Sequence, residues 1–172
     1  MTTNLAFAPP AKTVDGLNAV PIDIDTITAS LEFDGATNSG RGDATLDFHC
    51  GLADGCPVFD LRQTITEAWL DGQPVPLPQV ARHDFGGGPD AGMLVLAVVL
   101  AAGSRHTLRV AYTLGTPQAS GAGSYQPRMQ WAAGPRLAFN FGFTDLGAGR
   151  YLEAWVPATS STTSSSCTCR CA

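Results

Sequence analysis

The chain has 172 residues, of which 44% are hydrophobic and 15% charged, and its formal net charge at pH 7 is -5. This length fits one domain with a real core, because a chain near 150 residues hides roughly 70% of its unfolded surface. Nucleic-acid binding draws on clustered Lys and Arg, whereas the ten basic residues here are scattered singly and include one lysine, Lys12. The composition therefore argues against nucleic acid as a partner.

The amino terminus and the most apolar run bear on location. The first ten residues have neither the positive n-region nor the apolar h-region of a secretory signal. The run from Met93 to Ala102 is about half as long as a membrane-spanning helix must be. We therefore expect a cytoplasmic protein without a membrane partner.

The first predicted elements are strands, because glycines and prolines divide the chain into short apolar runs. From Ile22 to Phe33 the apolar alternation switches phase once, as it does in a long strand with a β-bulge, and Asp34-Gly35 ends it. The segment from Ala44 to His49 alternates apolar and polar residues, which predicts a strand with one buried face.

A hairpin follows, with strands at 65–70 and 73–77 joined by Asp71-Gly72, a dipeptide that supplies the positive φ angles of a tight turn. Pro74 and Pro76 place the return strand at a sheet edge. Two more strands are predicted at 93–100 and 107–114.

The last predicted strands, at 128–131 and 137–143, follow an exposed loop at 115–127. Seven or more short strands without a useful helical period predict an all-β fold, an antiparallel β-sandwich or saddle. We expect three parts: a flexible amino-terminal segment at 1–21, the β-sandwich domain at 22–158, and a disordered tail at 159–172.

The tail changes abruptly to Ser, Thr and Cys from Thr159 and has no apolar face. Its cysteines, Cys167, Cys169 and Cys171, alternate, whereas closed zinc sites use pairs two to four residues apart with further ligands. A weak site for a thiophilic metal is thus a minor alternative to a disordered linker.

A third interpretation of the tail uses only the genetic code. Back-translated with one extra A in front, residues 159–171 give Asn-Leu-Ile-Tyr-Asp-Gln-Phe-Glu-Leu-His-Leu-Pro-Val in the shifted frame. The second half of this peptide alternates as a strand does. The hypothesis is that the tail is a frameshift product and the chain a truncated one.

Candidate catalytic motifs are weak. His49, His83 and His106 lie far apart and outside any H-E-x-x-H motif, so ordinary strand-face histidines are expected. Ser124 in Gly-Ala-Gly-Ser-Tyr lacks the second glycine of a nucleophile elbow. The run from Gly86 to Pro89 lacks the Lys-Ser/Thr ending of a phosphate loop and predicts a turn.

Candidate cysteine, acidic and aromatic sites also have ordinary explanations. Cys50 and Cys56 would form a disulfide only in an exported chain, and reduced thiols are favoured in the cytoplasm. No calcium-loop spacing occurs, and Arg41-Gly-Asp43, which matches the integrin-recognition tripeptide, is interpreted as turn chemistry. The remaining candidates are the aspartates, expected to cap turns, and the tryptophans, expected in the core: Asp43, Asp47, Asp54 and Asp60; Trp69, Trp131 and Trp155.

Four stretches together carry a family resemblance: residues 31–34 (Leu-Glu-Phe-Asp), the Asp71-Gly72 hairpin, the strand region 102–112, and residues 143–157, which end in Trp-Val-Pro. They resemble the amino-terminal saddle domain of aminopeptidase N-type zinc metallopeptidases over roughly residues 22–158. The resemblance implies a β-saddle that packs on a thermolysin-like catalytic domain, roofs its cleft and positions peptide amino termini without hydrolysing them.

The departures from that family matter for function. Its H-E-x-x-H motif and its G-x-M-E-N loop are absent, and Gln130 is the nearest candidate for its amine-anchoring glutamine, without being assigned to that role. A zinc-activated water needs three protein ligands and a general base. We therefore expect no catalytic, cofactor-binding or metal-binding residue and no enzyme activity in this chain, with zinc held only by a missing catalytic domain.

Three functions remain open at this stage. The first is a truncated, non-catalytic amino-terminal domain, whose apolar face for the missing catalytic domain predicts self-association. The second is a free-standing β-sandwich module that binds carbohydrate or protein, which predicts an exposed aromatic patch. The third is an assembly domain with an open sheet edge, which predicts oligomers.

Overall fold

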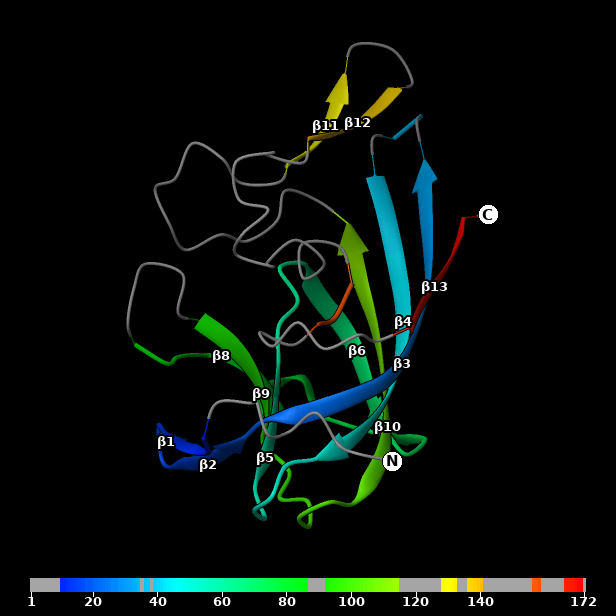
Figure 1. Ribbon diagram of the computed structural model, residues 1–172. Coiled ribbons are helices and arrows are strands. Elements are labelled where there is room, and N and C mark those ends of the chain that lie inside the picture. The colour runs from blue at the N-terminus through cyan, green and yellow to red at the C-terminus, as the bar shows by residue number, and fades with distance from the viewer. Residues whose placement is uncertain are drawn as a thin grey trace.

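The computed structural model describes residues 10–34, 36–37, 39–86, 92–114, 128–132, 136–140, 156–158 and 166–171. These residues form strands, turns and one short 3-10 helix, η2, and none of the helical structure among them is long and apolar enough to cross a membrane (Figure 1). The elements are β1 (Lys12–Val14), β2 (Leu17–Val20), β3 (Ile22–Asp34), β4 (Ser39–Cys50), β5 (Cys56–Phe59), β6 (Thr64–Leu70), β7 (Gln73–Pro74), η2 (Leu77–Gln79), β8 (Val80–Asp84), β9 (Gly92–Leu96), β10 (Arg105–Leu114), β11 (Arg128–Ala132), β12 (Arg136–Asn140) and β13 (Ser166–Cys171). The all-β prediction is confirmed.

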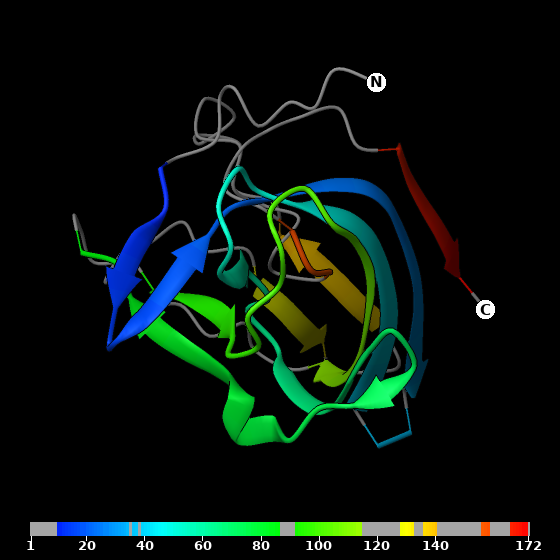
Figure 2. The same cartoon turned by 90° about the horizontal axis from the view of Figure 1, so that it is seen from below.

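The strands form two main sheets. A five-stranded sheet has the order β1-β2-β5-β9-β8, and a six-stranded sheet has the order β13-β3-β4-β10-β6-β7. Strands β11 and β12 pair with each other alone. Figure 2, seen from below, shows the long strands β3, β4 and β10 curving side by side as one wall, so the six-stranded sheet has a concave and a convex face.

The predicted bulge in the first long strand is confirmed. The register between β3 and β4 shifts between Ile24 and Thr26, and the buried residues change from Ile22 and Ile24 to Ile27 and onward. Because one extra residue inverts the alternation, both halves of β3 present their apolar residues to the same core.

The predicted hairpin turn at Asp71-Gly72 is also confirmed, but the return strand β7 ends at Pro74 rather than at residue 77, where η2 begins. The φ angles of Asp71 and Gly72 are 50° and 77°, and Leu70 pairs with Gln73 across the turn. Positive φ at both central residues identifies a type I′ turn, which matches the right-handed twist of the flanking strands. Strand β7 is the edge strand of the six-stranded sheet. Pro74 has no backbone N–H, and at an edge no further strand needs that donor.

A second Asp-Gly turn lies in the amino-terminal segment that we expected to be flexible. Asp15 and Gly16 have φ angles of 46° and 81° and join β1 to β2, so this part of the segment is a hairpin. Val20 is fully buried and pairs in parallel with β5. The ordered fold therefore begins before residue 22, because the Asp-Gly turn brings a second strand into the five-stranded sheet.

Two other boundaries differ from the prediction. Strand β9 ends at Leu96 rather than continuing to residue 100, because the chain turns there and Leu100 bridges to Gly55 instead. Residues 166–171 form β13, parallel to β3, where the sequence predicted a disordered tail. Backbone pairing at a sheet edge needs no apolar face, which explains how this polar segment can be a strand. The rest of the tail lies outside the described residues.

The main core lies between the two sheets, and its largest fully buried side chains include Tyr112, Phe48 and Phe59. Burying side chains of this size contributes about 1.5–3 kcal/mol each. A smaller cluster of Val14, Val58 and Val95 covers the other face of the five-stranded sheet. The six-stranded sheet thus keeps its convex face for polar residues.

Candidate functional site

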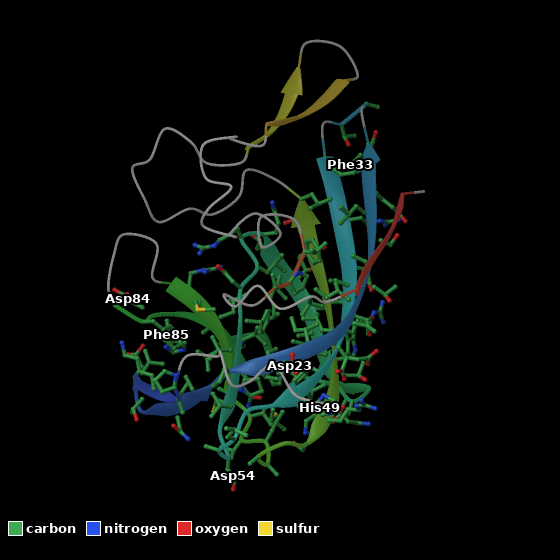
Figure 3. All side chains as sticks on the ribbon, viewed as in Figure 1. Asp23, Phe33, His49, Asp54, Asp84 and Phe85 are labelled. Atoms are coloured by element: carbon green, nitrogen blue, oxygen red, sulfur yellow. The ribbon has the colours of Figure 1, made fainter. Side chains whose placement is uncertain are left out.

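The convex face of the six-stranded sheet carries a broad set of polar side chains, and we call it the outer face. It is the solvent side of β3, β4, β10 and β6, whose other side is buried. Its members are hydroxyls and charges: Thr28, Ser30, Glu32, Arg41, Asp43, Thr45, Asp47, Thr66, Thr107, Arg109 and Thr113. Figure 3 shows the long axis along which these strands run, with Phe33 near one end and Asp54 near the other.

Ion pairs across neighbouring strands organise this face. The Nη2 atom of Arg109 lies 2.6 Å from Oδ2 of Asp43, and the Arg109 guanidinium lies 4.5 Å from the centre of the Trp69 ring. Asp43 raises the already high pKa of Arg109 through this hydrogen bond. Because the pair is exposed, it contributes at most about 1 kcal/mol to stability.

A groove of about 490 Å³ lies on the outer face. Its lining includes Ser30, Glu32, Arg41, Asp43 and Thr66, and it contains no histidine or cysteine. Arg41 is already paired with Glu32 at 2.5 Å. The groove therefore offers hydroxyls and paired charges, which suit hydrogen bonding to a polar ligand rather than bond cleavage.

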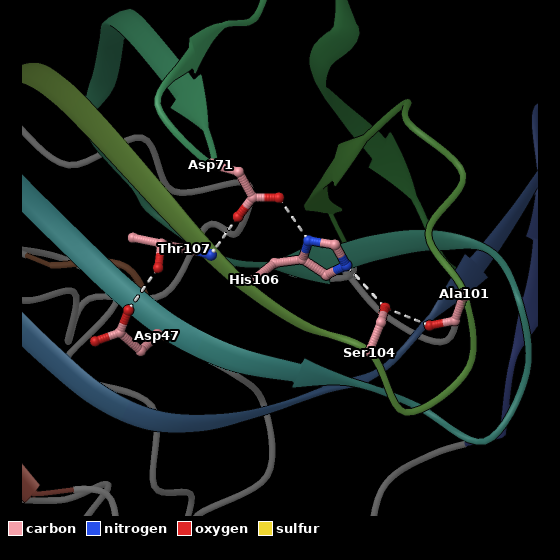
Figure 4. Close-up of polar contacts among 6 residues, drawn as sticks. All are labelled: Asp47, Asp71, Ala101, Ser104, His106 and Thr107. Carbon is pink, nitrogen blue, oxygen red and sulfur yellow. Dashed lines mark hydrogen bonds and ion pairs between the residues drawn. The ribbon is translucent and has the colours of Figure 1, made fainter.

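A Ser-His-Asp chain at the start of β10 is the most enzyme-like constellation in the described part (Figure 4). The Oγ atom of Ser104 lies 2.7 Å from Nε2 of His106, and Nδ1 of His106 lies 2.7 Å from Oδ2 of Asp71. Asp71 also accepts the Thr107 backbone N–H at 2.9 Å. The order of atoms is that of a nucleophile, a base and an orienting acid.

The hydrogen bonds around Ser104 oppose a nucleophilic role. Its Oγ lies 2.6 Å from the carbonyl oxygen of Ala101, which can only accept, so the single hydroxyl proton points there. With that proton directed at Ala101, Ser104 does not donate it to Nε2 of His106, as a nucleophile would to its general base. The backbone N–H groups of Gly103 and Ser104 are bound to Gly51 and Ala101, so neither is free to stabilise an oxyanion.

The chain is better explained as a structural clasp. It joins the turn at 101–104, the start of β10 and the β6–β7 turn. Burial raises the pKa of Asp71, but hydrogen bonds from Thr107 and His106 outweigh that effect and hold its pKa below 3.8. No sequence motif indicates this cluster, because its members meet only through strand register and a turn.

A second buried cluster centres on Asp60, which is 6% exposed. Its carboxylate lies 2.6 Å from Nη2 of Arg62 and 2.9 Å from Nη1 of Arg82. Arg82 also donates to the carbonyls of Leu61 and Gly92. Burial raises the pKa of Asp60 although both arginines oppose the change. The cluster links the end of β5 to β8.

The structure separates the candidate histidines. His49 Nδ1 lies 3.1 Å from Asp25, and His83 Nδ1 lies 2.6 Å from Asp15. Like His106, each lies beside an aspartate, but Asp25 also pairs with Arg105 and Nδ1 of His49 makes no hydrogen bond in the described part. Among the described residues, no three His, Cys, Asp or Glu side chains gather where they could hold a metal ion.

Several other predicted roles need correction. Arg41-Gly42-Asp43 lies within β4 rather than in a turn, because the Tyr112 ring occupies the place of a Gly42 side chain. Trp69 lies on the outer face and not in the core, since its neighbours on β6 are the ones that point inward. Asp60 is buried in an ion cluster instead of capping a turn.

The remaining candidates divide between confirmed and undescribed positions. Asp54 caps a turn as predicted, accepting the Ala102 N–H at 2.8 Å. Asp47 instead accepts hydroxyls on the strand face. Cys50 and Cys56 are free thiols. Gly86 is in a bend with φ 70°. Gln130 and Trp131 lie on β11, where only the backbone is described. The positions outside the described residues are Ser124, Trp155 and 87–89.

Comparison with known proteins gives structural matches only. No protein-family model matches the chain, and no curated protein does. An M1 zinc metallopeptidase from Deinococcus radiodurans matches 74% of this chain at 20% identity and a TM-score of 0.43. A mutant of that enzyme bound to a Tyr-Ser-Ala substrate matches 66% of this chain at 23% identity, with the same TM-score.

A more distant match is yeast LTA4 hydrolase in complex with bestatin, at 12% identity over 54% of this chain and a TM-score of 0.40. The matches cover 25% and 26% of the two Deinococcus chains and 14% of the yeast enzyme. This chain therefore spans about a quarter of the bacterial enzymes' length. In fold, the chain is similar to part of the M1 zinc metallopeptidases.

Proposed function

We propose that this chain is the non-catalytic amino-terminal domain of an aminopeptidase N-like zinc metallopeptidase. Its role is that of a scaffold: it packs against a zinc-bearing catalytic domain that lies outside this sequence and covers that domain's substrate cleft. Under this proposal the chain holds no cofactor of its own.

The observation that carries the proposal is the placement of the stretches behind the family resemblance. Residues 31–34 end β3, the Asp71-Gly72 turn joins β6 to β7, and residues 105–112 lie in β10. All of them belong to the same six-stranded sheet. Val156 and Ala158, beside the Trp-Val-Pro stretch, are buried, and Ala158 bridges to Asp60. Stretches that are far apart in sequence thus contribute to one folded unit.

The use of the polar groups supports a scaffold role. Ser104, His106 and Asp71 hold a turn against a sheet, and Asp60 holds two arginines that join β5 to β8. Each of these groups is hydrogen-bonded or ion-paired to a neighbour. Removing the group would leave that neighbour without this partner. Such groups serve stability first.

The state of the cysteines supports the cytoplasmic part of the proposal. Cys50 belongs to the core between the sheets, and Cys56 belongs to the cluster on the opposite face of the five-stranded sheet. Both are free thiols, and burial raises the pKa of each. Buried reduced thiols suit a reducing compartment.

One observation favours a second candidate, a module that binds a polar ligand such as a carbohydrate. The groove on the outer face has hydroxyls and charges at its walls. However, the exposed large hydrophobic residues of the described part are Leu52, Leu77 and Val99, and Arg109 lies over the ring of Trp69. Carbohydrate modules rely on open aromatic faces, so this candidate ranks second.

The decisive test is to resequence the encoding DNA from the codon of Trp155 through several hundred bases downstream, in all frames. The proposal expects a shifted frame that continues into a sequence with H-E-x-x-H and a distant Glu. A confirmed stop codon with no such frame behind it would overturn the proposal and favour the polar-ligand module.

A second test measures peptidase activity of the purified 172-residue chain. With a chromogenic amino-acid amide and added zinc, we expect no hydrolysis above buffer. The matched variant is Ser104→Ala: hydrolysis by the parent chain that this substitution abolished would reassign the clasp as an active site. Hydrolysis that needs zinc, survives the substitution and co-elutes with the chain would contradict the scaffold role.

A further inference from the structure

The outer edge of β3 is covered by the last described strand, β13, in a single continuous register. The pairing is parallel and runs from Ser166 opposite Thr26 to Cys171 opposite Leu31. The register has no shift along these six pairs. β13 is the outermost strand of its sheet. Without β13, this edge of β3 would be the edge of the sheet.

The register sorts the tail positions onto two faces. Cys167 and Cys169 lie opposite Ile27 and Ala29, which are each 2% exposed, and Cys171 lies opposite Leu31, which packs against the core. The alternate tail positions lie opposite exposed β3 residues: 166, 168 and 170 face Thr26, Thr28 and Ser30. Directly paired residues share a face of the sheet. The three cysteines therefore take the register positions of the core face.

The genetic code links these positions to apolar residues. A cysteine codon is TGT or TGC, so a frame that begins one base earlier places T and G as the second and third bases of its codon. Every codon ending in TG encodes Leu, Met or Val. Positions 167, 169 and 171 are thus apolar in the shifted frame whatever synonymous codons the gene uses. The threonine at 168 becomes Tyr or His by the same rule, because its shifted codon takes the final T or C of the Cys167 codon as its first base, and either residue suits an exposed position.

We propose that the edge of β3 from Thr26 to Leu31 is a docking surface for a strand of fixed register. Its proper occupant is the shifted-frame form of residues 166–171, Glu-Leu-His-Leu-Pro-Val. Leu, Leu and Val extend the core past Ile27, Ala29 and Leu31, while Glu, His and Pro face outward. A proline is tolerated there because β13 is an edge strand. The inference extends the proposed function but uses only strand register and codon structure.

The test compares two full-length variants that gain the same three apolar residues. The inward variant carries Cys167→Leu, Cys169→Leu and Cys171→Val. The outward variant carries Ser166→Leu, Thr168→Leu and Arg170→Val. A third variant, with serine at the three cysteine positions, controls for loss of the thiols. Thermal unfolding is measured for each, and hydrogen exchange is followed at the backbone amides of residues 26–31.

We expect the inward variant to raise Tm by roughly 5–10 °C over the parent chain, from the burial of three aliphatic side chains at partial efficiency. Exchange at the β3 edge should slow at least tenfold. The outward variant should leave Tm unchanged or lower it. An equal gain from both triples, or no gain and no protection from the inward triple, would overturn the register assignment.

Failure of this inference is distinguishable from failure of the proposed function. If the inward triple stabilises β3 while the resequenced gene shows no shifted frame, the docking surface stands and the peptidase domain assignment falls. If the gene encodes a downstream H-E-x-x-H and the inward triple has no effect, the domain assignment stands and the docking surface falls.

Discussion

Replacing Gly42 with alanine should destabilise the fold strongly, because the new methyl group would overlap a buried tyrosine ring. A Cβ atom at Gly42 would lie 2.2 Å from Cε2 and Cζ of Tyr112 and 2.7 Å from its hydroxyl oxygen. Carbon atoms in contact prefer separations near about 3.5–4.0 Å, so the ring would have to move by more than about 1 Å. Tyr112 is 1% exposed and packed in the main core, which leaves no open space for that movement.

The cost follows from overpacking. Forcing an extra methyl group into a packed core typically costs about 1–3 kcal/mol, and the depth of this overlap places Gly42→Ala near the upper limit. For a chain of this size such a loss lowers Tm by roughly 6–12 °C. Urea unfolding followed by tryptophan fluorescence measures the free energy directly.

The control is the double variant Gly42→Ala, Tyr112→Leu, which removes the ring that the new methyl group meets. We expect a favourable coupling energy of more than about 1 kcal/mol in the double-mutant cycle. Gly72→Ala serves as the comparison for backbone strain alone, because nothing lies within 4 Å of its Cβ position and its φ is 77°. Additive effects at Gly42 and Tyr112, or a loss below about 0.5 kcal/mol for Gly42→Ala, would refute the packing argument.

Three further predictions follow from the buried charges and thiols. Asp60→Ala should lower the free energy of unfolding by about 3–5 kcal/mol, because it leaves two arginines in the interior without their partner; a loss below about 1 kcal/mol in urea unfolding would contradict this. Asp71→Asn should lower stability at pH 7. The difference from the parent should shrink as the pH falls through the depressed folded pKa of Asp71, because protonation removes the contribution of its carboxylate. Urea midpoints measured from pH 7 through a series of acidic pH values follow the change, and a difference that stays constant until the parent itself unfolds would argue against it. Cys50 and Cys56 should react with a disulfide reagent only as fast as the fold opens, since both are buried with raised pKa values. A variant with serine at positions 167, 169 and 171 leaves these two as its cysteines, and immediate reaction of both would disprove their burial.

Local sequence signals predicted the elements whose cause is local. The alternation and its single phase switch at 22–33 gave β3 with its bulge, and Asp71-Gly72 gave a type I′ turn. Asp15-Gly16 is the same signal, but the strands on either side of it have only three and four residues, too few for a period-2 alternation to show. The hairpin β1–β2 was missed for that reason.

Features that depend on contacts between distant residues were not predictable. Glycine in Arg41-Gly-Asp43 suggested a turn, whereas the actual cause is the Tyr112 ring from a strand that comes 70 positions later. The clasp of Asp71, Ser104 and His106 depends on the register between β6 and β10. Neither the period of one strand nor a short motif contains that information.

The parallel pairing of β13 with β3 has a consequence for how the chain folds during synthesis. Strand β4 follows β3 directly and can pair with its inner edge as soon as both leave the ribosome. The other edge of β3 must wait for its partner, because Leu31 pairs with Cys171. The two residues are 140 positions apart, so at about 5–20 residues per second that delay is roughly 7–28 s. During this interval the unpaired edge of one nascent chain is open to the edge of another, so the order of synthesis makes β3 the point from which misassembly between nascent chains would start.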